Sequence, residues 1–200
     1  EIIGGEVRMV ESNAHINTRS PDWESQDPTT HKFGFHRGTD VPFGSHTRHG
    51  LYHSNFVKTL TNLTDLDPDD GGTVVIAGSH KIDLPPKQLI ECAYQDRSLI
   101  HQVIAPAGST LLFAEPLIHA TGHLTSERER VIIITGYGPA QFPYWGDGEL
   151  TDEFKAQIPP NQHLLFHGRQ NWNRRVKERE DLMTPVDPRP FELGTWNQRD

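Results

Sequence analysis

The chain has 200 residues, which is the size of one domain with its own core, and 34% of them are hydrophobic. Its formal net charge of −8 argues against a nucleic acid or an anionic membrane as partner, and no apolar run reaches the roughly 18 residues of a membrane span. The single cysteine, Cys92, excludes an internal disulfide and indicates a reducing compartment, so we expect a cytoplasmic protein.

The first 30 residues are expected to form an entry segment. Gly4-Gly5 stops a helix end, a short strand runs through Val7 and Val10, and a polar loop or lid follows over residues 13–30.

Residues 31–138 alternate between short apolar runs, rich in β-branched and aromatic residues, and turns rich in Gly, Pro and Asp. This pattern predicts a core of strands at residues 31–38, 51–65, 73–76, 99–104, 110–118 and 130–135, with a helix or irregular segment at 85–98. Residues 139–200 form a C-terminal extension with short helices at 150–158, capped by Thr151, and at 161–168. Six strands and few helices predict a mainly β fold, an antiparallel sandwich or jelly roll with peripheral helices, in one domain over residues 1–200.

Two residues at the last pair of predicted strands have functional chemistry. His119 follows the strand at 110–118, and Arg130 opens the strand at 130–135. Imidazole is a common metal ligand, and guanidinium binds carboxylates in a bidentate manner. If these strands pair and curve into a barrel, both side chains point into one place. With 12 histidines in the chain, a metal site is the first hypothesis to test.

An iron(II) oxygenase site needs two imidazoles and usually one carboxylate, which leaves positions open for oxygen and a bidentate co-substrate. His119 is a candidate late ligand, and Arg130 is a candidate clamp for the far carboxylate of 2-oxoglutarate. Thr121 lies two residues after His119, on the same face of a strand, and could donate its hydroxyl to that carboxylate. Arg128 is the rival clamp, but we expect it to be solvated in the turn.

The early half of the site leaves alternatives open. The usual arrangement is His-x-Asp or His-x-Glu at the end of an early strand, and His36 is our first choice because it follows an alternating strand. Two residues later stands Gly38, not an acid. Asp40 could reach the metal if the chain turns at Gly38, or the position could be vacant for water or chloride. In the third alternative the ligand is not His36 but one of three later histidines, His46, His49 or His53.

Together these residues resemble the phytanoyl-CoA dioxygenase superfamily of iron(II)/2-oxoglutarate oxygenases. The segment TVVIAGSHK, after LTNLTD and the acidic turn DPDDGG, is similar to the family's strand, turn and PGSHK segment, with Ala77 in place of proline. The stretch APAGSTLLFAEPLIHATG is similar to the family's stretch around the late histidine, with Ser109 where aspartate is common. The separation of eleven residues between His119 and Arg130 is the family's spacing between that ligand and the co-substrate arginine.

The resemblance covers about residues 1–140, and we expect the N-terminal helical region of that family to be absent here. It implies a double-stranded β-helix core, ferrous iron, 2-oxoglutarate and O2, and oxidation of a C–H bond of a small organic substrate, most simply hydroxylation, with release of succinate and CO2. Three alternatives remain. The His-x-Gly at residues 36–38 resembles that of iron halogenases; a cupin-like enzyme with another metal would not need Arg130; and a degenerate jelly roll would bind without catalysis.

Overall fold

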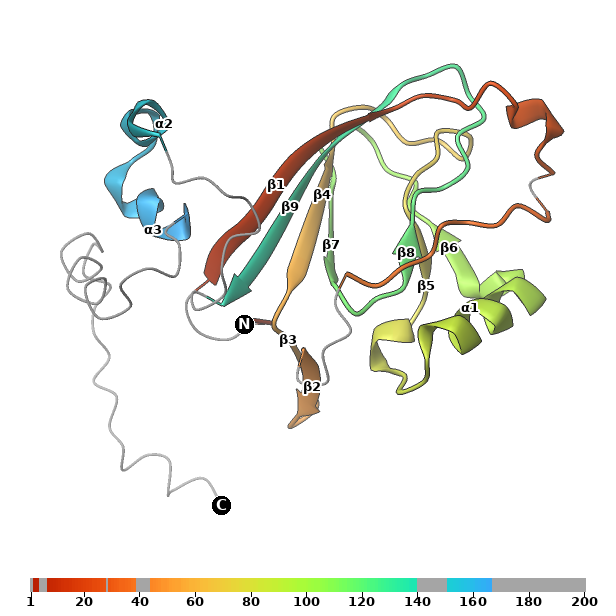
Figure 1. Ribbon diagram of the computed structural model, residues 1–200, viewed down its shortest axis with the longest axis horizontal. Helices are drawn as coiled ribbons and strands as arrows, with labels where there is room; N and C mark the ends of the chain where they lie inside the picture. The colour runs from red at the N-terminus through yellow and green to blue at the C-terminus, as the bar shows by residue number, and fades with distance from the viewer. Residues whose placement is uncertain (1, 4–6, 28, 39–43, 140–150, 167–200) are drawn as a thin grey trace.

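The computed structural model describes residues 2–3, 7–27, 29–38, 44–139 and 151–166. These residues form a mainly β fold of the jelly-roll type, built from a larger and a smaller antiparallel sheet, with α1 beyond the smaller sheet (Figure 1). The larger sheet has the order β1 (Val7–Asn17), β9 (Arg130–Pro139), β4 (Val57–Asn62) and β7 (Thr110–Ala114). The smaller sheet has the order β6 (Ile100–Gln102), β5 (Val74–Ile76) and β8 (His119–Ala120).

The other elements lie around these two sheets. The strands β2 (Ser45–Arg48) and β3 (Leu51–Ser54) form a hairpin of their own. The helices are α1 (Pro86–Gln95), α2 (Asp152–Gln157) and α3 (His163–Phe166), with 3-10 turns at Trp23–Ser25, Ser79–Lys81, Arg97–Leu99 and Pro160–Gln162. No helix in the part of the chain that the structure describes is long and apolar enough to span a membrane.

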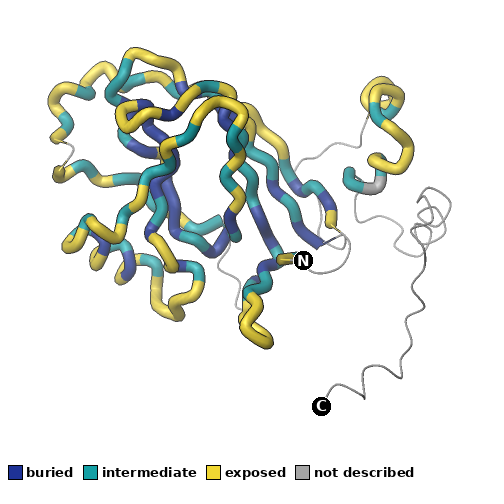
Figure 2. The backbone as a smooth tube through the Cα atoms, turned by 180° about the vertical axis from the view of Figure 1, so that it is seen from behind, coloured by how far each residue is buried: buried dark blue, intermediate teal, exposed yellow. Residues whose placement is uncertain are grey.

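One face of the larger sheet forms a core cluster. Leu60 of β4 lies opposite Ile134 of β9 and Leu111 of β7, so these three side chains share a face. Leu60, Phe113 and Ile132 are buried together there. Because side chains alternate along a strand, Arg130 lies on the same face as Ile132 and points inward. Figure 2 shows buried positions along the central strands of the two sheets, whereas the β2–β3 hairpin and most loops are exposed.

The smaller sheet has its own core under α1. Helix α1 begins with Pro86 at its first position, where a missing N–H costs nothing. Leu89 and Ala93, four residues apart, pack against Ile76 and Ile118 of the sheet. Since Ile118 faces α1, the next residue along the strand, His119, faces the other way, toward the larger sheet.

The predicted pairing of residues 110–118 with 130–135 is wrong. The first run forms β7 in the larger sheet and then a turn in which Leu117 N–H donates to the carbonyl of Ala114 (2.9 Å). The next strand, β8, belongs to the smaller sheet. β9 pairs with β1 and β4, so β4 lies between β7 and β9. His119 on β8 and Arg130 on β9 therefore belong to different sheets, which face each other across the sandwich.

Other boundaries also differ from expectation. β1 continues to Asn17 along β9 where a polar loop was expected, because its backbone pairs with that strand over its whole length. The strand expected at 31–38 is reduced to one bridge at His36, and the strand expected at 51–65 is interrupted between β3 and β4. The helix at 150–158 is confirmed as α2, with the Thr151 hydroxyl accepting from Phe154 N–H (3.2 Å).

Candidate metal and co-substrate site

His36 and His119 face each other across an antiparallel bridge that joins the segment around His36 to β8. The two residues exchange both backbone hydrogen bonds, with N···O distances of 3.0 and 3.1 Å. Residues paired in this way carry their side chains on the same face of the ladder. Accordingly, the two imidazole centroids are only 4.4 Å apart.

Each imidazole is oriented by a carbonyl two residues earlier in the chain. Nδ1 of His36 lies 3.0 Å from the oxygen of Gly34, and Nδ1 of His119 lies 2.8 Å from that of Leu117. Because a carbonyl only accepts, both Nδ1 atoms carry the proton, and both Nε2 atoms present a lone pair. This tautomer is the one that binds a metal through Nε2 with its ring orientation fixed.

Burial lowers the pKa of His119 to about 4; the hydrogen bond to the Leu117 carbonyl opposes this shift, and the charges of His36 and Lys58 add to it. His119 is therefore neutral at pH 7, as a metal ligand must be.

The Gly-Ser-His-Lys segment holds His119 in place. Ser79 is fully buried, and its hydroxyl accepts from Ile118 N–H (2.8 Å), directly before His119 in the chain. The turn is possible because Gly78 has φ +77°, a conformation that glycine adopts without strain. On the opposite side, the Phe113 ring of the larger sheet contacts the His119 ring with centroids 4.6 Å apart. The motif thus fixes the backbone directly before His119.

Arg130 is buried between the sheets with most of its hydrogen-bonding capacity unused. It is 2% exposed, and its Nη2 donates to the Thr73 hydroxyl (3.0 Å) at the start of β5. Among the described residues, Nε and Nη1 have no hydrogen-bond partner. Burial lowers the pKa of Arg130, yet a guanidinium remains charged at neutral pH. A buried cation with two unfilled donors is costly unless a ligand completes it, and a carboxylate matches those donors.

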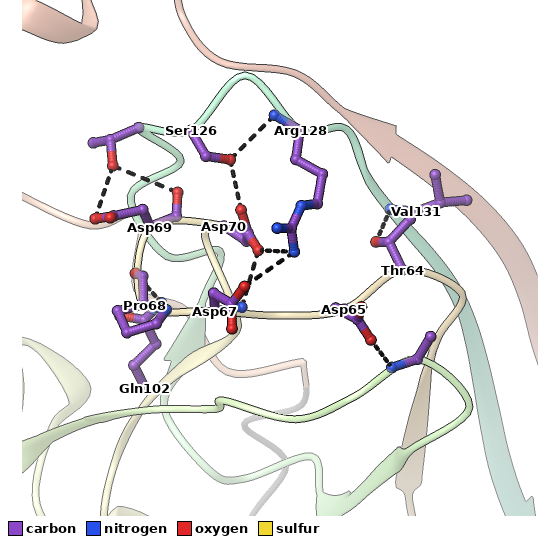
Figure 3. A network of polar contacts seen from close by, with 12 residues as sticks. Thr64, Asp65, Asp67, Pro68, Asp69, Asp70, Gln102, Ser126, Arg128 and Val131 are labelled. Atoms are coloured by element: carbon purple, nitrogen blue, oxygen red, sulfur yellow. Dashed lines mark hydrogen bonds and ion pairs between the residues drawn. The ribbon is translucent and has the colours of Figure 1, made fainter.

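Arg128, the rival clamp, is held by the acidic turn. Its Nη1 lies 3.1 Å from Oδ2 of Asp67 and 2.9 Å from Oδ2 of Asp70, and its side chain is 47% exposed (Figure 3). Burial acts to raise the pKa of Asp70, but hydrogen bonds from Ser126 and Asp67 N–H, together with the charge of Arg128, hold it below the ordinary value. Arg128 is therefore engaged in structure.

The remaining predicted residues have different positions. Thr121 is exposed, and the hydroxyl that Arg130 contacts belongs to Thr73, which the sequence reasoning did not select. β5 and β8 pair Val74 with Ala120 and Val75 with His119, and one further pair in this register sets Thr73 opposite Thr121. Because this pairing joins segments distant in sequence, the sequence pattern alone did not identify Thr73. Asp40 lies outside the described residues.

The alternative early histidines lie on the separate hairpin. His46 of β2 and His53 of β3 are paired in register, and their rings stack at 5.0 Å. His49, with φ 52°, lies in the turn between these strands. The structure thus brings His36, and none of these three, into backbone pairing with His119.

The residues present fit an iron site with a bidentate acid as co-substrate. Two imidazoles with Nε2 directed outward stand on one face, and an incompletely paired guanidinium is buried between the same sheets. Over the described ranges, no three His, Cys, Asp or Glu side chains are close enough together to hold a metal. As the side chains stand, two imidazoles are brought together, and a third candidate ligand does not join them within the described residues.

Comparison with solved structures shows the same fold. HygX from Streptomyces hygroscopicus with nickel and 2-oxoglutarate bound is 24% identical, covers 77% of this chain and 67% of its own, and has a TM-score of 0.57. The HygX complex with nickel, 2-oxoglutarate and hygromycin B is 23% identical over 76% of this chain and 64% of its own, with a TM-score of 0.56. HygX with iron bound is 23% identical over 77% of this chain and 68% of its own, with a TM-score of 0.55.

Comparison with protein families identifies the relationship. No curated protein matches the sequence. The family model described as phytanoyl-CoA dioxygenase (PhyH) matches residues 10–132, more than half of the chain, and includes His36, His119 and Arg130. The chain therefore belongs to the phytanoyl-CoA dioxygenase family and is an iron(II)- and 2-oxoglutarate-dependent oxygenase.

Proposed function

We propose that this enzyme hydroxylates a C–H bond of a small organic substrate, with conversion of 2-oxoglutarate and O2 to succinate and CO2. One observation carries the proposal: Arg130 is buried with two unfilled donors in the same sandwich as two imidazoles oriented for a metal. A satisfied structural arginine would not leave Nε and Nη1 without partners.

His36 and His119 would hold iron through Nε2, and the iron supplies activation of O2 when bound. Arg130 would bind the far carboxylate of 2-oxoglutarate through its unfilled donors, with Thr73 fixing the guanidinium from the other side. Thr121 remains a predicted second hydroxyl for that carboxylate. Asp40, four residues after His36, remains a candidate third ligand. Phe113 and the core around it exclude water from the His119 ring.

The alternatives differ in what they require of Arg130. A cupin-like enzyme without 2-oxoglutarate has no use for a buried guanidinium with free donors, and a degenerate binding protein has no use for metal-ready imidazoles. The halogenase alternative requires an open position beside Gly38. A cytoplasmic location remains part of the proposal, supported by the single cysteine.

The test is release of succinate from 2-oxoglutarate by the iron-loaded protein in air, together with anaerobic Fe(II) titration. We expect succinate release from the wild type, and loss of both succinate release and Fe(II) binding in His119→Ala. The matched control is His46→Ala, an exposed histidine on the separate hairpin, which should leave both unchanged. Absence of succinate from the wild type, or equal Fe(II) binding by His119→Ala, would contradict the proposal.

A further inference from the structure

Glu115 is an acidic residue buried beside the site. It follows β7 and stands four residues before His119, with an exposed fraction of 0%. Its backbone is fixed on both sides, because its N–H donates to the Phe56 carbonyl (3.0 Å) and its carbonyl accepts from Gly38 N–H (3.4 Å). The segment from His36 to Gly38 therefore runs alongside the segment from Glu115 to His119.

The Glu115 carboxylate fills the space beside Gly38. A Cβ atom added to Gly38 would lie 1.7 Å from Oε2 of Glu115 and 2.6 Å from its Oε1. Real Cβ atoms do not approach other atoms so closely, so no side chain fits at position 38 while Glu115 keeps this position. An acidic side chain at position 38 and the carboxylate of Glu115 would therefore need the same volume.

The charge around this carboxylate is incompletely balanced. Oε1 of Glu115 lies 2.6 Å from Nζ of Lys58, and the same Nζ lies 3.0 Å from Oε1 of Glu11. One cation is shared between two carboxylates, so these three side chains carry one net negative charge when ionised. Oε2 of Glu115, the oxygen closest to Gly38, has no hydrogen-bond partner among the residues described. A buried oxygen of this kind is the expected companion of a cation.

We propose that Glu115 supplies the carboxylate that the His-x-Gly sequence lacks, as the third protein ligand of the metal beside His36 and His119. The inference rests on the proposed iron site and deepens it. As placed, the carboxylate is bonded to Lys58 and does not close a three-ligand group, so it exchanges Lys58 for the metal on binding.

Halide binding at this position is disfavoured for the same reason. An open site for chloride requires an empty, uncharged volume next to Gly38, whereas here the volume contains a carboxylate. Like charges so close repel strongly in a buried site. The Gly38 position therefore supports hydroxylation over halogenation.

The test measures metal affinity by anaerobic Fe(II) calorimetry on the apoprotein, without turnover. Glu115→Gln keeps the size of the side chain and removes the charge, and we expect it to weaken Fe(II) binding by about tenfold or more. Glu91→Gln, an exposed carboxylate on α1, is the matched control and should change the affinity by less than about twofold, as surface substitutions usually do. Equal affinity for Glu115→Gln and the wild type would overturn the proposal, and loss of binding in Asp40→Ala alone would assign the ligand to Asp40.

A relocation variant keeps the proposal testable if Glu115→Gln folds poorly. Gly38→Asp in the wild-type background should be destabilised, because the new side chain meets the Glu115 carboxylate. In Glu115→Ala the space is vacant, so the double variant Gly38→Asp/Glu115→Ala should bind Fe(II) much more tightly than Glu115→Ala alone. A double variant no tighter than Glu115→Ala would contradict the shared position. His119→Ala separates the two proposals: if it binds Fe(II) as the wild type does, the iron site itself fails.

Discussion

Arg128 and Arg130 are separated by one residue, yet they are used in different ways. Arg128 is half exposed and paired with two aspartates of the acidic turn, whereas Arg130 is buried with one hydrogen bond, to Thr73. A polar group that is fully paired within the protein contributes to the fold. A buried one left incomplete points to a ligand that the protein is built to bind.

The largest expected effect is that substitutions of these two arginines change different properties, 2-oxoglutarate affinity for Arg130 and unfolding free energy for Arg128. Arg130→Met should weaken 2-oxoglutarate binding about 30-fold or more, because a buried carboxylate–guanidinium contact is worth about 2–5 kcal/mol. The same change should leave the unfolding free energy of the apoprotein unchanged or higher, since it removes an incompletely paired buried charge. Calorimetry with 2-oxoglutarate and urea denaturation measure the two quantities.

Arg128→Met is the matched control and should show the reverse pattern. We expect a loss of about 1 kcal/mol in unfolding free energy, because the buried Asp70 loses its cation, with unchanged affinity for 2-oxoglutarate. If Arg128→Met weakened 2-oxoglutarate binding and Arg130→Met did not, the two assignments would have to be exchanged.

The second effect concerns a buried hydroxyl that is fully paired. Ser79→Ala removes the acceptor of Ile118 N–H and should lower the unfolding free energy by about 1–3 kcal/mol, because the N–H remains buried without a partner. The backbone before His119 should loosen with it, so Fe(II) affinity should fall as well. A stability change below about 0.5 kcal/mol, typical of a surface substitution, would show that the hydroxyl does not hold β8.

The third effect compares two threonines near Arg130. Thr73→Val keeps the shape of the side chain and removes the hydroxyl that Arg130 contacts. One hydrogen bond of about 0.5–1.5 kcal/mol should be lost, which lowers 2-oxoglutarate affinity severalfold. Thr121→Val should have the smaller effect, since Thr121 is exposed. A larger loss in Thr121→Val would identify Thr121 as the main hydroxyl at the co-substrate.

The smallest effect is the pH response of the acidic turn. Because the pKa of Asp70 is lower in the folded than in the unfolded chain, its contribution to stability is present above the unfolded value of about 4 and is lost as the pH falls through the folded value. Denaturation of Asp70→Asn should show less of this acid-side decline than the wild type. An identical pH profile for both proteins would exclude Asp70 as a contributor.

The sequence predicted local features well and spatial partners poorly. Alternating apolar residues located most of the strands, and a spacing of eleven residues selected His119 and Arg130. Nothing in that spacing could reveal that β4 inserts between β7 and β9, since strand order depends on contacts distant in sequence. The same limit explains Thr73 and Glu115. Thr73 reaches Arg130 from β5, and Glu115, although only four residues before His119, is placed beside Gly38 by the turn after β7; the sequence pattern shows neither neighbour.

The backbone bridge between His36 and His119 also has a consequence for stability. Only one residue pair forms this bridge, so few ladder hydrogen bonds hold the segment around His36 to β8 before a metal binds. A metal held by both imidazoles would join residues 36 and 119 in the folded chain, so the two segments could separate only with loss of a metal ligand. A ligand that binds only the folded state stabilises it, and the stabilisation grows with the logarithm of the ligand concentration divided by its dissociation constant. Iron should therefore raise the melting temperature of the protein and reduce local opening of the segment that carries His36. Iron would then hold the segment around His36 in place, in addition to activating O2.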